Sequence, residues 1–182
     1  MDTAEILHII SRIRSGDTDA FRVLVRQYKE MVFGLALKMT RQREDAEEIA
    51  QDTFLKAFKG IQRFKGQSKF STWLYQIGYF TAINHLRKKK LQVIEIDDIP
   101  VADESESVLE KLNNDDQKIM IDKALGLLKP DERALVTFFY LDEMSMEEIA
   151  KITELTLSNV KVKIHRSRKK LHDVLVCLMK KN

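Results

Sequence analysis

Apolar residues recur three and four positions apart along most of the chain, with polar and charged residues between them. Ile6, Ile9 and Ile13 begin this pattern, and Leu24 and Tyr28 continue it. Such spacing places apolar side chains on one face of an α-helix. Residues that break helices are scarce, with two prolines and six glycines among 182 residues. The pattern therefore predicts an all-α protein.

Polar breaks in the pattern predict where the helices end. In the first half we expect helices at about 3–15, from a break at 16–17 to about 40, at about 43–60, and from a cap at or near Ser71 to Lys90. Residues 93–107 lack the periodicity and contain Pro100, which is typical of a linker. A second helical array is expected from about Glu110, with breaks at 129–131, at 142–143 and near 156.

Charge divides the chain in the same way. Residues 1–92 hold 17 basic and 10 acidic residues, residues 93–117 hold one basic and nine acidic, and residues 118–182 hold 13 basic and nine acidic. This predicts two basic helical domains, 1–92 and 118–182, joined by a flexible acidic linker, 93–117. Because the net charge of +3 conceals two basic domains, the distribution indicates binding to a polyanion.

Residues 53–92 combine cations with aromatic rings. They contain nine basic residues, no acidic residue, and eight of the 14 aromatic residues of the chain. Cations attract a phosphate backbone, and aromatic faces stack on unpaired bases. The run therefore suggests a surface for single-stranded or melting nucleic acid. The alternative is a packed helical core with a solvated basic face, and the run alone does not separate the two.

Residues 146–170 have the pattern of a helix-turn-helix. Residues 146–152 predict a short amphipathic helix, residues 153–155 a turn, and Thr156 can cap a longer helix that begins at Leu157. The second helix is basic, which is typical of a recognition helix and also of a solvated face. The position of the turn and its cap favours DNA binding.

Other classes of protein find little support in the sequence. Cys177 is the single cysteine, and the four histidines have no metal-ligand spacing. The start of the chain is too charged for a signal peptide, and no apolar run is long enough for a membrane span. Two Asp-Asp pairs, 97–98 and 115–116, lie in the predicted linker, so a DNA-cleaving enzyme is a weak alternative. We expect a cytoplasmic protein that is not an enzyme and has no cofactor.

Three segments in order resemble bacterial RNA polymerase sigma factors of the extracytoplasmic-function (ECF) type. They are DAEEIAQDTFLKAF from Asp45, FKG with FSTWLYQI from Phe64 and Phe70, and a third made of LKPDER from Leu128, EIA from Glu148 and VK with HRSR from Val160. The resemblance covers nearly the whole chain. It implies a region 2 helical bundle and a region 4 helix-turn-helix, which bind core RNA polymerase and the −10 and −35 elements of a promoter.

The resemblance assigns the first segment to core polymerase. The matching positions are Asp45, Glu48, Gln51, Asp52, Phe54 and Leu55. Acids and amides around a small apolar patch would suit a polar helical partner. The alternative for Phe54 and Leu55 is a place in the core.

The second segment is assigned to the −10 element, where family members capture an extruded base in a pocket. The candidate residues are Lys65, Lys69, Phe70, Ser71, Thr72, Gln76, Tyr79, Phe80, Asn84, Arg87 and Lys88. Helical spacing puts Trp73 and Tyr75 on different faces, so we expect Trp73 to be largely core. Lys65 and Lys69 should supply salt-dependent attraction, whereas Tyr79 and Phe80 should act on strand opening.

The third segment is assigned to the −35 element, with Thr156 as the cap of its recognition helix. We expect base-edge contacts from Lys161, Val162 and His165, and phosphate contacts from Lys163, Arg166 and Arg168. Ser158 and Asn159 should lie near the DNA backbone. Val162 would suit a thymine methyl group.

Two positions depart from the family pattern. Phe80 stands where members often carry Asn, and a phenyl ring cannot read a base edge by paired hydrogen bonds. Glu154 replaces a glycine that is frequent in the turn, so the turn must avoid positive φ or accept strain of about 1 kcal/mol or more.

The resemblance also implies two further features. In the family the linker threads toward the active-site cleft of the polymerase, although a solubilising tether would have the same composition. An anti-sigma protein commonly holds members inactive, and the sequence identifies none. The alternative function is a helix-turn-helix transcriptional regulator that is not a sigma factor, but the first half offers no ligand or phosphoacceptor domain.

Overall fold

The computed structural model describes residues 1–91 and 114–180, and these contain helices and turns without any strand. The expectation of an all-α fold is confirmed. The chain divides into two compact units, one built on Met1–Lys89 and the other including α5, α6 and α8. Each unit has its own packing and is described separately.

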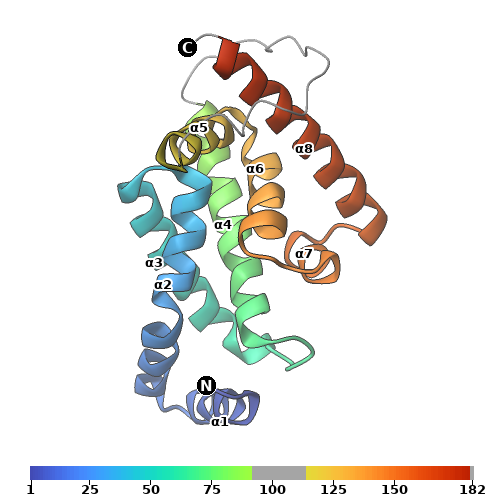
Figure 1. Ribbon diagram of the computed structural model, residues 1–182. Helices are drawn as coiled ribbons and strands as arrows, with labels where there is room; N and C mark the ends of the chain where they lie inside the picture. The colour runs from blue at the N-terminus through green and yellow to red at the C-terminus, as the bar shows by residue number, and fades with distance from the viewer. Residues whose placement is uncertain (92–113, 181–182) are drawn as a thin grey trace. The chain divides into compact units, whose positions relative to one another are not determined.

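The first unit contains four α-helices and two short 3-10 turns (Figure 1). They are α1 (Thr3–Arg14), η1 (Thr18–Ala20), α2 (Phe21–Thr40), α3 (Arg43–Gly60), η2 (Ile61–Arg63) and α4 (Phe70–Leu91). The predicted helices agree with these closely because each begins or ends at a polar or glycine break. Helix α4 begins one residue before the predicted cap.

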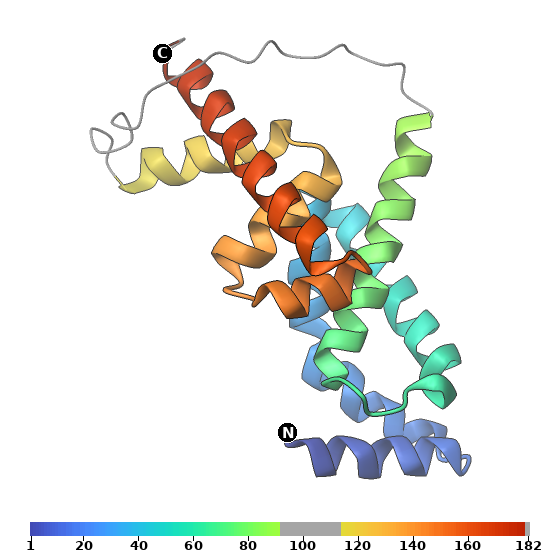
Figure 2. The ribbon, with the colours of Figure 1, turned by 90° about the vertical axis from the view of Figure 1, so that its right-hand side faces the viewer.

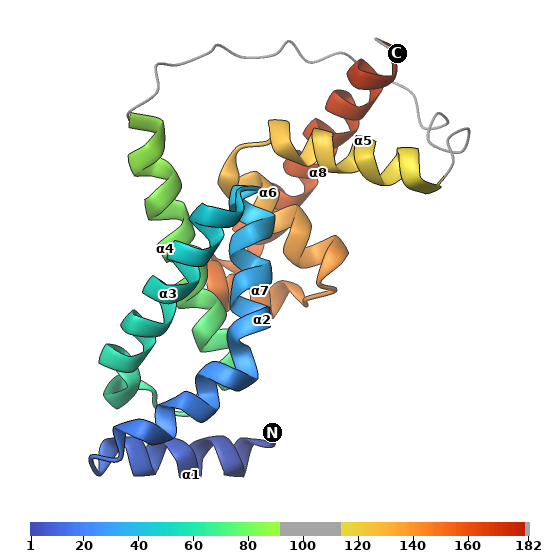
Figure 3. The same cartoon turned by 90° about the vertical axis from the view of Figure 1, so that its left-hand side faces the viewer.

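Helix α1 is closed at its start by two reciprocal hydrogen bonds. The Glu5 amide donates to Asp2 Oδ1 over 2.8 Å, and the Asp2 amide donates to Glu5 Oε2 over 2.9 Å. Gly16, with φ +104°, turns the chain after the helix ends. Figures 2 and 3 show α1 lying across one end of α2–α4. Its isoleucines are buried in the core there.

Helices α2, α3 and α4 enclose the rest of this core (Figure 3). Gly78 permits close packing, since a Cβ there would lie 2.9 Å from Leu35 Cδ2 on α2 and 3.6 Å from Thr53 Cγ2 on α3. Trp73 is partly buried against the core, in line with the expectation from helical spacing. The buried core residues are Ile6, Ile9, Ile10, Ile13, Ala20, Phe21, Leu24, Val32, Ala57, Ile61, Phe64, Phe70 and Leu74.

The second half of the chain contains α5 (Asn114–Leu127), α6 (Pro130–Val136), a π-helical turn (Thr137–Leu141), α7 (Met146–Thr153) and α8 (Leu157–Lys180). The predicted break at 129–131 spans the start of α6 at Pro130, and the predicted breaks at 142–143 and near 156 fall between elements. Helix α5 begins inside the stretch that the sequence assigned to the linker. The rest of that linker, including the expected start of the array at Glu110, lies outside the described residues.

Helix α8 packs against α5 and α6 (Figure 2). Met120 and Ala124 of α5 meet Val174 and Leu175 of α8. Arg133 of α6 is buried, and its guanidinium donates to the carbonyls of Leu125, Gly126 and Leu128 at 2.8, 3.0 and 3.2 Å. These carbonyls lie at and just beyond the C-terminal end of α5, where the regular helical donors run out, so Arg133 completes that end and fixes α6 beside it.

Candidate nucleic-acid and polymerase interfaces

Helix α7 starts with a capping box. Ser145 Oγ accepts from the Glu148 amide over 3.2 Å, and the Ser145 amide donates to Glu148 Oε2 over 3.1 Å. Ile149 and Ile152, four and seven residues beyond the cap, are buried. The short helix is therefore held at its start and along one face.

The turn after α7 has the geometry of a helix-turn-helix. Thr156 Oγ1 accepts from the Asn159 amide over 3.2 Å, so Thr156 caps α8 as the sequence predicts. Glu154 has φ +57°, in the left-handed region that glycine prefers. Of the two alternatives for this departure, the turn adopts the strained one.

The N-terminal part of α8 presents its polar side to solvent. Val160 and Ile164 are buried, whereas Val162 is 45% exposed. The other members of the predicted −35 set are exposed as well: Thr156, Ser158, Asn159, Lys161, Lys163, His165, Arg166 and Arg168. A groove of DNA could reach this face without unfolding the helix.

One predicted phosphate contact already has an ionic partner. Lys163 Nζ lies 3.3 Å from Asp131 Oδ2 at the start of α6. Farther along, Lys170 Nζ lies 3.1 Å from Glu132 Oε2. Both lysines thus help to hold α8 against α6. Lys163 would have to exchange Asp131 for a phosphate when DNA binds.

The predicted polymerase set on α3 divides into two groups. Glu48, Gln51 and Asp52 are exposed, and Leu55 is 57% exposed. Phe54 instead packs partly buried against the core, with its ring 6.5 Å from that of Phe21. The exposed group forms one polar surface with an apolar residue at its end.

Asp45 turns toward α4 rather than to solvent. Its side chain is 15% exposed and lies 2.7 Å from Lys89 Nζ and 3.2 Å from His85 Nε2. The hydrogen bond from Lys89, assisted by His85, lowers the pKa of the Asp45 carboxyl against the opposing effect of burial. Lys89 also donates to Gln42 Oε1 over 2.7 Å. Asp45 therefore joins α3 to α4.

His85 and Lys89 were not among the functional residues predicted from the sequence. They lie four residues apart, one turn of α4, and this spacing was the available signal. Their acidic partner Asp45 precedes them by 40 and 44 residues, so only the fold brings the three together.

Two residues of the predicted −10 set belong to the interior. Phe70 is 3% exposed and packs on Phe64 and Trp73, with ring centroids 5.5 Å away in both cases. Tyr79 is 7% exposed. The prediction that Phe70 and Tyr79 contact DNA directly therefore does not hold, because neither ring can stack on a base without leaving its buried position.

The other members of that set are accessible to different degrees. Lys65, Lys69, Asn84, Arg87 and Lys88 are exposed, and Ser71, Thr72, Gln76 and Phe80 are partly buried. They border two pockets in the first unit.

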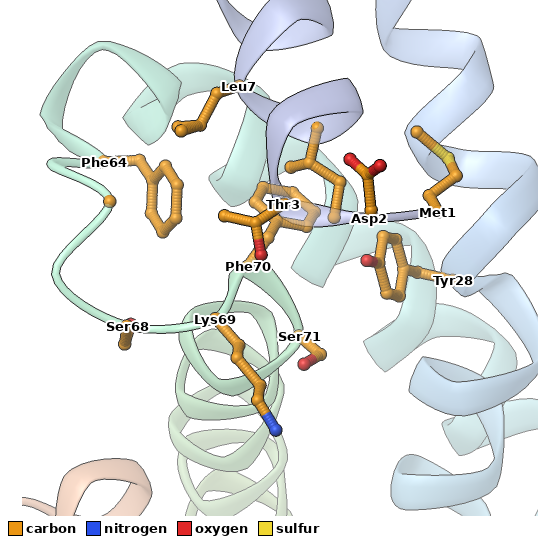
Figure 4. Close-up of a pocket in the computed structure, with 12 residues that line it drawn as sticks. Met1, Asp2, Thr3, Leu7, Tyr28, Phe64, Ser68, Lys69, Phe70 and Ser71 are labelled. Atoms are coloured by element: carbon orange, nitrogen blue, oxygen red, sulfur yellow. The ribbon is translucent and has the colours of Figure 1, made fainter.

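The first, called here the loop pocket, has a volume of about 300 Å³. It lies between the start of α1, Tyr28 of α2, the loop before α4 and the first turn of α4 (Figure 4). Leu7 and Phe64 line it, and the side chain of Lys69 extends away along α4. Gly66, with φ +69°, supplies the turn of the loop.

Arg14 holds the start of this loop. Its Nη2 donates to the carbonyls of Ile61, Gln62 and Phe64 at 3.1, 3.3 and 2.5 Å. These carbonyls follow the end of α3 and lie 47 to 50 residues from Arg14. Sequence reasoning missed Arg14, since no local pattern signals a contact at such separation.

The second, called here the helix pocket, lies between α3 and α4 and has a volume of about 430 Å³. Its lining residues are Lys56, Gly60, Arg63, Trp73, Gln76, Ile77, Phe80, Thr81 and Asn84. Lys56 Nζ donates to Thr81 Oγ1 over 3.0 Å. The predicted −10 set omitted Lys56 and Arg63, although both lie in the basic aromatic run.

Family comparisons agree with this arrangement. The Sigma-70 region 2 model matches residues 24–92, and the Sigma-70, region 4 model matches residues 118–171. The ECF RNA polymerase sigma factor SigW of Bacillus subtilis is 32% identical over 91% of this chain and 94% of its own length. This chain belongs to the ECF sigma factors. The ECF sigma-E factor of Haemophilus influenzae is 30% identical over 94% of the chain and 95% of its own length.

Solved structures of sigma factors share the fold. CnrH, in complex with the cytosolic domain of CnrY, has a TM-score of 0.66 at 22% identity and covers 97% of this chain and 99% of its own. RpoE of Bartonella quintana, in complex with the anti-sigma factor NepR, has a TM-score of 0.64 at 23% identity and covers 85% and 96%.

As an ECF sigma factor, the protein is an alternative sigma factor that binds core RNA polymerase and promoter DNA to initiate transcription. Sigma factors are initiation factors and are generally not enzymes. No helix in the described ranges is long and apolar enough to cross a membrane. Nor does the described part of this sigma factor gather three or more side chains able to hold a metal ion.

Proposed function

We propose that residues 1–92 bind core polymerase and the −10 element and that residues 118–182 bind the −35 element, with 93–117 as their linker. The main support for this division is the exposed cationic face of α8 that follows the Thr156 cap. This face belongs to a different domain from the basic aromatic run of residues 53–92. Each surface has the charge that its partner requires. We further propose that the protein acts in the cytoplasm, without a cofactor or catalytic activity of its own.

The polymerase surface is the exposed part of α3. Glu48, Gln51 and Asp52 are exposed, and Leu55 adds apolar area at the end of the same surface. Asp45 contributes indirectly, by fixing α3 against α4. The predicted polymerase set is therefore reduced to one face of the helix.

The loop pocket receives a base that leaves the stack when the −10 element opens. Opening one base-pair step costs about 1.4 kcal/mol. Stacking on an aromatic side chain, for which Tyr28 is the partly exposed ring of this pocket, returns about 1–3 kcal/mol per base. One or two captured bases can start a bubble but cannot maintain ten or more open pairs. Core polymerase supplies the remainder, so the isolated sigma factor should melt DNA poorly.

Different positions along helix α8 contact different parts of the DNA. Lys161, Val162 and His165 read base edges near the capped end, and Arg166 and Arg168 hold phosphates. Lys163 joins the second group after leaving Asp131.

An anti-sigma protein would regulate these surfaces. The solved structures of CnrH and of RpoE are complexes, with CnrY and with an anti-sigma factor respectively. A regulator of this kind would compete for the exposed face of α3 or for the DNA surfaces, and its identity is left open.

Core binding with charge-reversed α3 tests the polymerase assignment. Glu48→Lys with Asp52→Lys should abolish binding to core polymerase and leave helix content unchanged, since exposed substitutions usually alter stability by less than about 0.5 kcal/mol each. The matched control is Glu44→Lys with Glu47→Lys, which reverses two exposed acids in the first turns of α3. Equal binding by the unaltered protein and the Glu48/Asp52 variant would refute the assignment.

A further inference from the structure

The helix pocket has apolar walls, and one of them is formed by Phe80, at a position where family members often carry Asn. Trp73, Ile77 and Phe80 face it from α4, and Gly60 faces it from α3. We propose that this pocket holds a thymine of the −10 strand and selects it by its 5-methyl group. The inference rests on the proposed −10 role of residues 1–92 and adds the identity of one base.

The position of the Phe80 ring is set by its neighbours. Its centroid lies 5.1 Å from that of Tyr79 in an edge-to-face contact at 69°. Tyr79 is buried, so it provides a fixed support for the partly exposed ring of Phe80. Although Tyr79 does not reach DNA, it therefore shapes the wall that does.

On the opposite wall, Trp73 lies close to the backbone of α3. A Cβ at Gly60 would lie 3.5 Å from Trp73 Cζ2, which shows how near the indole comes to the backbone of α3. The interior between the two helices is thus formed mainly by indole, phenyl and aliphatic carbon. Such a surface offers dispersion contacts to a base but few hydrogen-bond partners.

The rim of the pocket is polar and positively charged. Lys56, Arg63 and Asn84 are exposed there, and the amide of Gln76 is partly buried. Lys56 Nζ uses one of its three protons on Thr81 Oγ1, which leaves two for a phosphate. None of the lining residues in the described part of the chain is acidic. The rim therefore complements the backbone of a nucleotide whose base enters the pocket.

Among the four bases, thymine fits this division between interior and rim. Its 5-methyl group is the one apolar substituent on a base edge, and apolar side chains including Phe contact it in protein–DNA complexes. With the methyl group inward, the polar edge of thymine points to Gln76 and Asn84. A purine or a cytosine has no methyl group to bury, and turning its polar edge inward would leave hydrogen-bonding atoms without partners.

A uracil scan tests the methyl group directly. The holoenzyme, formed from core polymerase and the full chain, is mixed with promoters recovered by in vitro transcription of a genomic library. Each thymidine of the non-template −10 strand is replaced singly by deoxyuridine, which retains base pairing and removes only the methyl group. We expect open complexes resistant to heparin to form about fourfold more slowly at one position, the factor for burial of one methyl-sized group.

Phe80→Asn should remove this sensitivity, so that thymidine and deoxyuridine become equivalent at that position. Tyr140→Asn, which alters an exposed ring outside the pocket, should retain it. The thymidine-to-deoxyuridine ratio is internal to each variant, so a general loss of activity does not affect it. Were Phe80→Asn to fail to fold, the scan on the unaltered protein would still decide the matter.

Three results would overturn the inference. Equal rates with thymidine and deoxyuridine at every position would do so and leave the −10 role intact, because initiation at the promoter would persist. Promoters whose −10 element contains no thymine would also overturn the inference and leave the −10 role intact. Failure to initiate at any promoter would instead refute the proposed function, and the inference with it.

Discussion

Glu154 shows how one residue can carry strain in a functional element. Its backbone lies at φ +57°, between the short helix α7 and the cap of α8. A side chain in this region costs about 1–2 kcal/mol, which glycine avoids. The sequence indicated that the turn must either avoid positive φ at Glu154 or accept backbone strain there. It could not decide between the two, since φ at one turn depends on how both helices pack.

Glu154→Gly should therefore stabilise the protein. Relief of strain exceeds the greater entropy of glycine in the unfolded chain, for a net gain of about 0.5–1 kcal/mol. Urea unfolding followed by circular dichroism measures this change. Lys151→Gly, at an exposed position past the first turn of α7, is the control and should destabilise by about 1 kcal/mol. Equal destabilisation by both variants would mean that the Glu154 backbone is not strained.

Asp45 should contribute to stability in a pH-dependent manner. Because Lys89 and His85 lower its pKa in the folded state, its contribution is present above the usual value of 3.8 and is lost as pH falls through the folded value. Asp45→Asn should cost about 1 kcal/mol at pH 7 and reduce the loss of stability between pH 5 and pH 3. Denaturant unfolding at several pH values tests this.

The control is Asp52→Asn on the exposed face of α3, which should change stability by less than about 0.5 kcal/mol at pH 7. Identical pH profiles for Asp45→Asn and the unaltered protein would contradict the structural role given to Asp45. A large effect of Asp52→Asn on stability would likewise argue against its place on a free surface.

At the scale of elements, the positions of the helices could be predicted from hydrophobic periodicity and polar breaks. Which side chains of α4 are buried could not be predicted in this way. Phe70 and Trp73 lie on one side of α4 and Tyr79 lies on another, and aromatic rings satisfy either a core or a nucleic-acid surface. Phe70 packs on Tyr28 of α2 and on Phe64, and Tyr79 is 7% exposed, so the structure buries both rings. Hydrophobic periodicity identifies a helix with one apolar face, whereas α4 has more than one.

Arg14 connects α1 to the loop that precedes α4, so its loss should disturb opening more than attraction. Arg14→Ala frees three carbonyls and should cost about 1 kcal/mol of stability. It should also slow open-complex formation by the holoenzyme while closed-complex affinity stays nearly constant. Permanganate reactivity of unpaired thymines reports the opening step.

Arg12→Ala is the matched control, since Arg12 lies on the same helix and forms an exposed ion pair with Asp17. It should alter stability by less than about 0.5 kcal/mol and leave opening unchanged. Equal effects of the two substitutions on opening would show that charge on α1, rather than the Arg14 contacts, is responsible.

Within α8, Lys161 and Arg168 should behave differently. Lys161→Ala should cost about 1–3 kcal/mol on the preferred −35 element and flatten the preference among sequences. Arg168→Ala should weaken all sequences similarly and reduce the salt slope by about one. Competition binding over a randomised −35 element measures both. A uniform shift across sequences for each variant would contradict the proposed division of base and phosphate contacts.

At the scale of the whole molecule, charge, segment order and the resemblance to ECF sigma factors were available from the sequence. The loop held by Arg14, the Asp45–Lys89 contact and the two pockets were not. Each joins residues at least 10 positions apart through packing, and such contacts leave no local pattern. The exposure of the residues proposed for polymerase and for the −35 element was easier to predict, because each of these sets lies on a single helix.

Transcription in vitro tests the central claim, that the surfaces of residues 1–92 and 118–182 together direct core polymerase to one class of promoter. Core polymerase is combined with the full chain and a genomic promoter library, and transcript starts are mapped. The account predicts discrete starts that share two sequence elements, absent with core alone and lost with the Glu48→Lys, Asp52→Lys variant. Starts without shared elements, or starts unchanged by that variant, would contradict it.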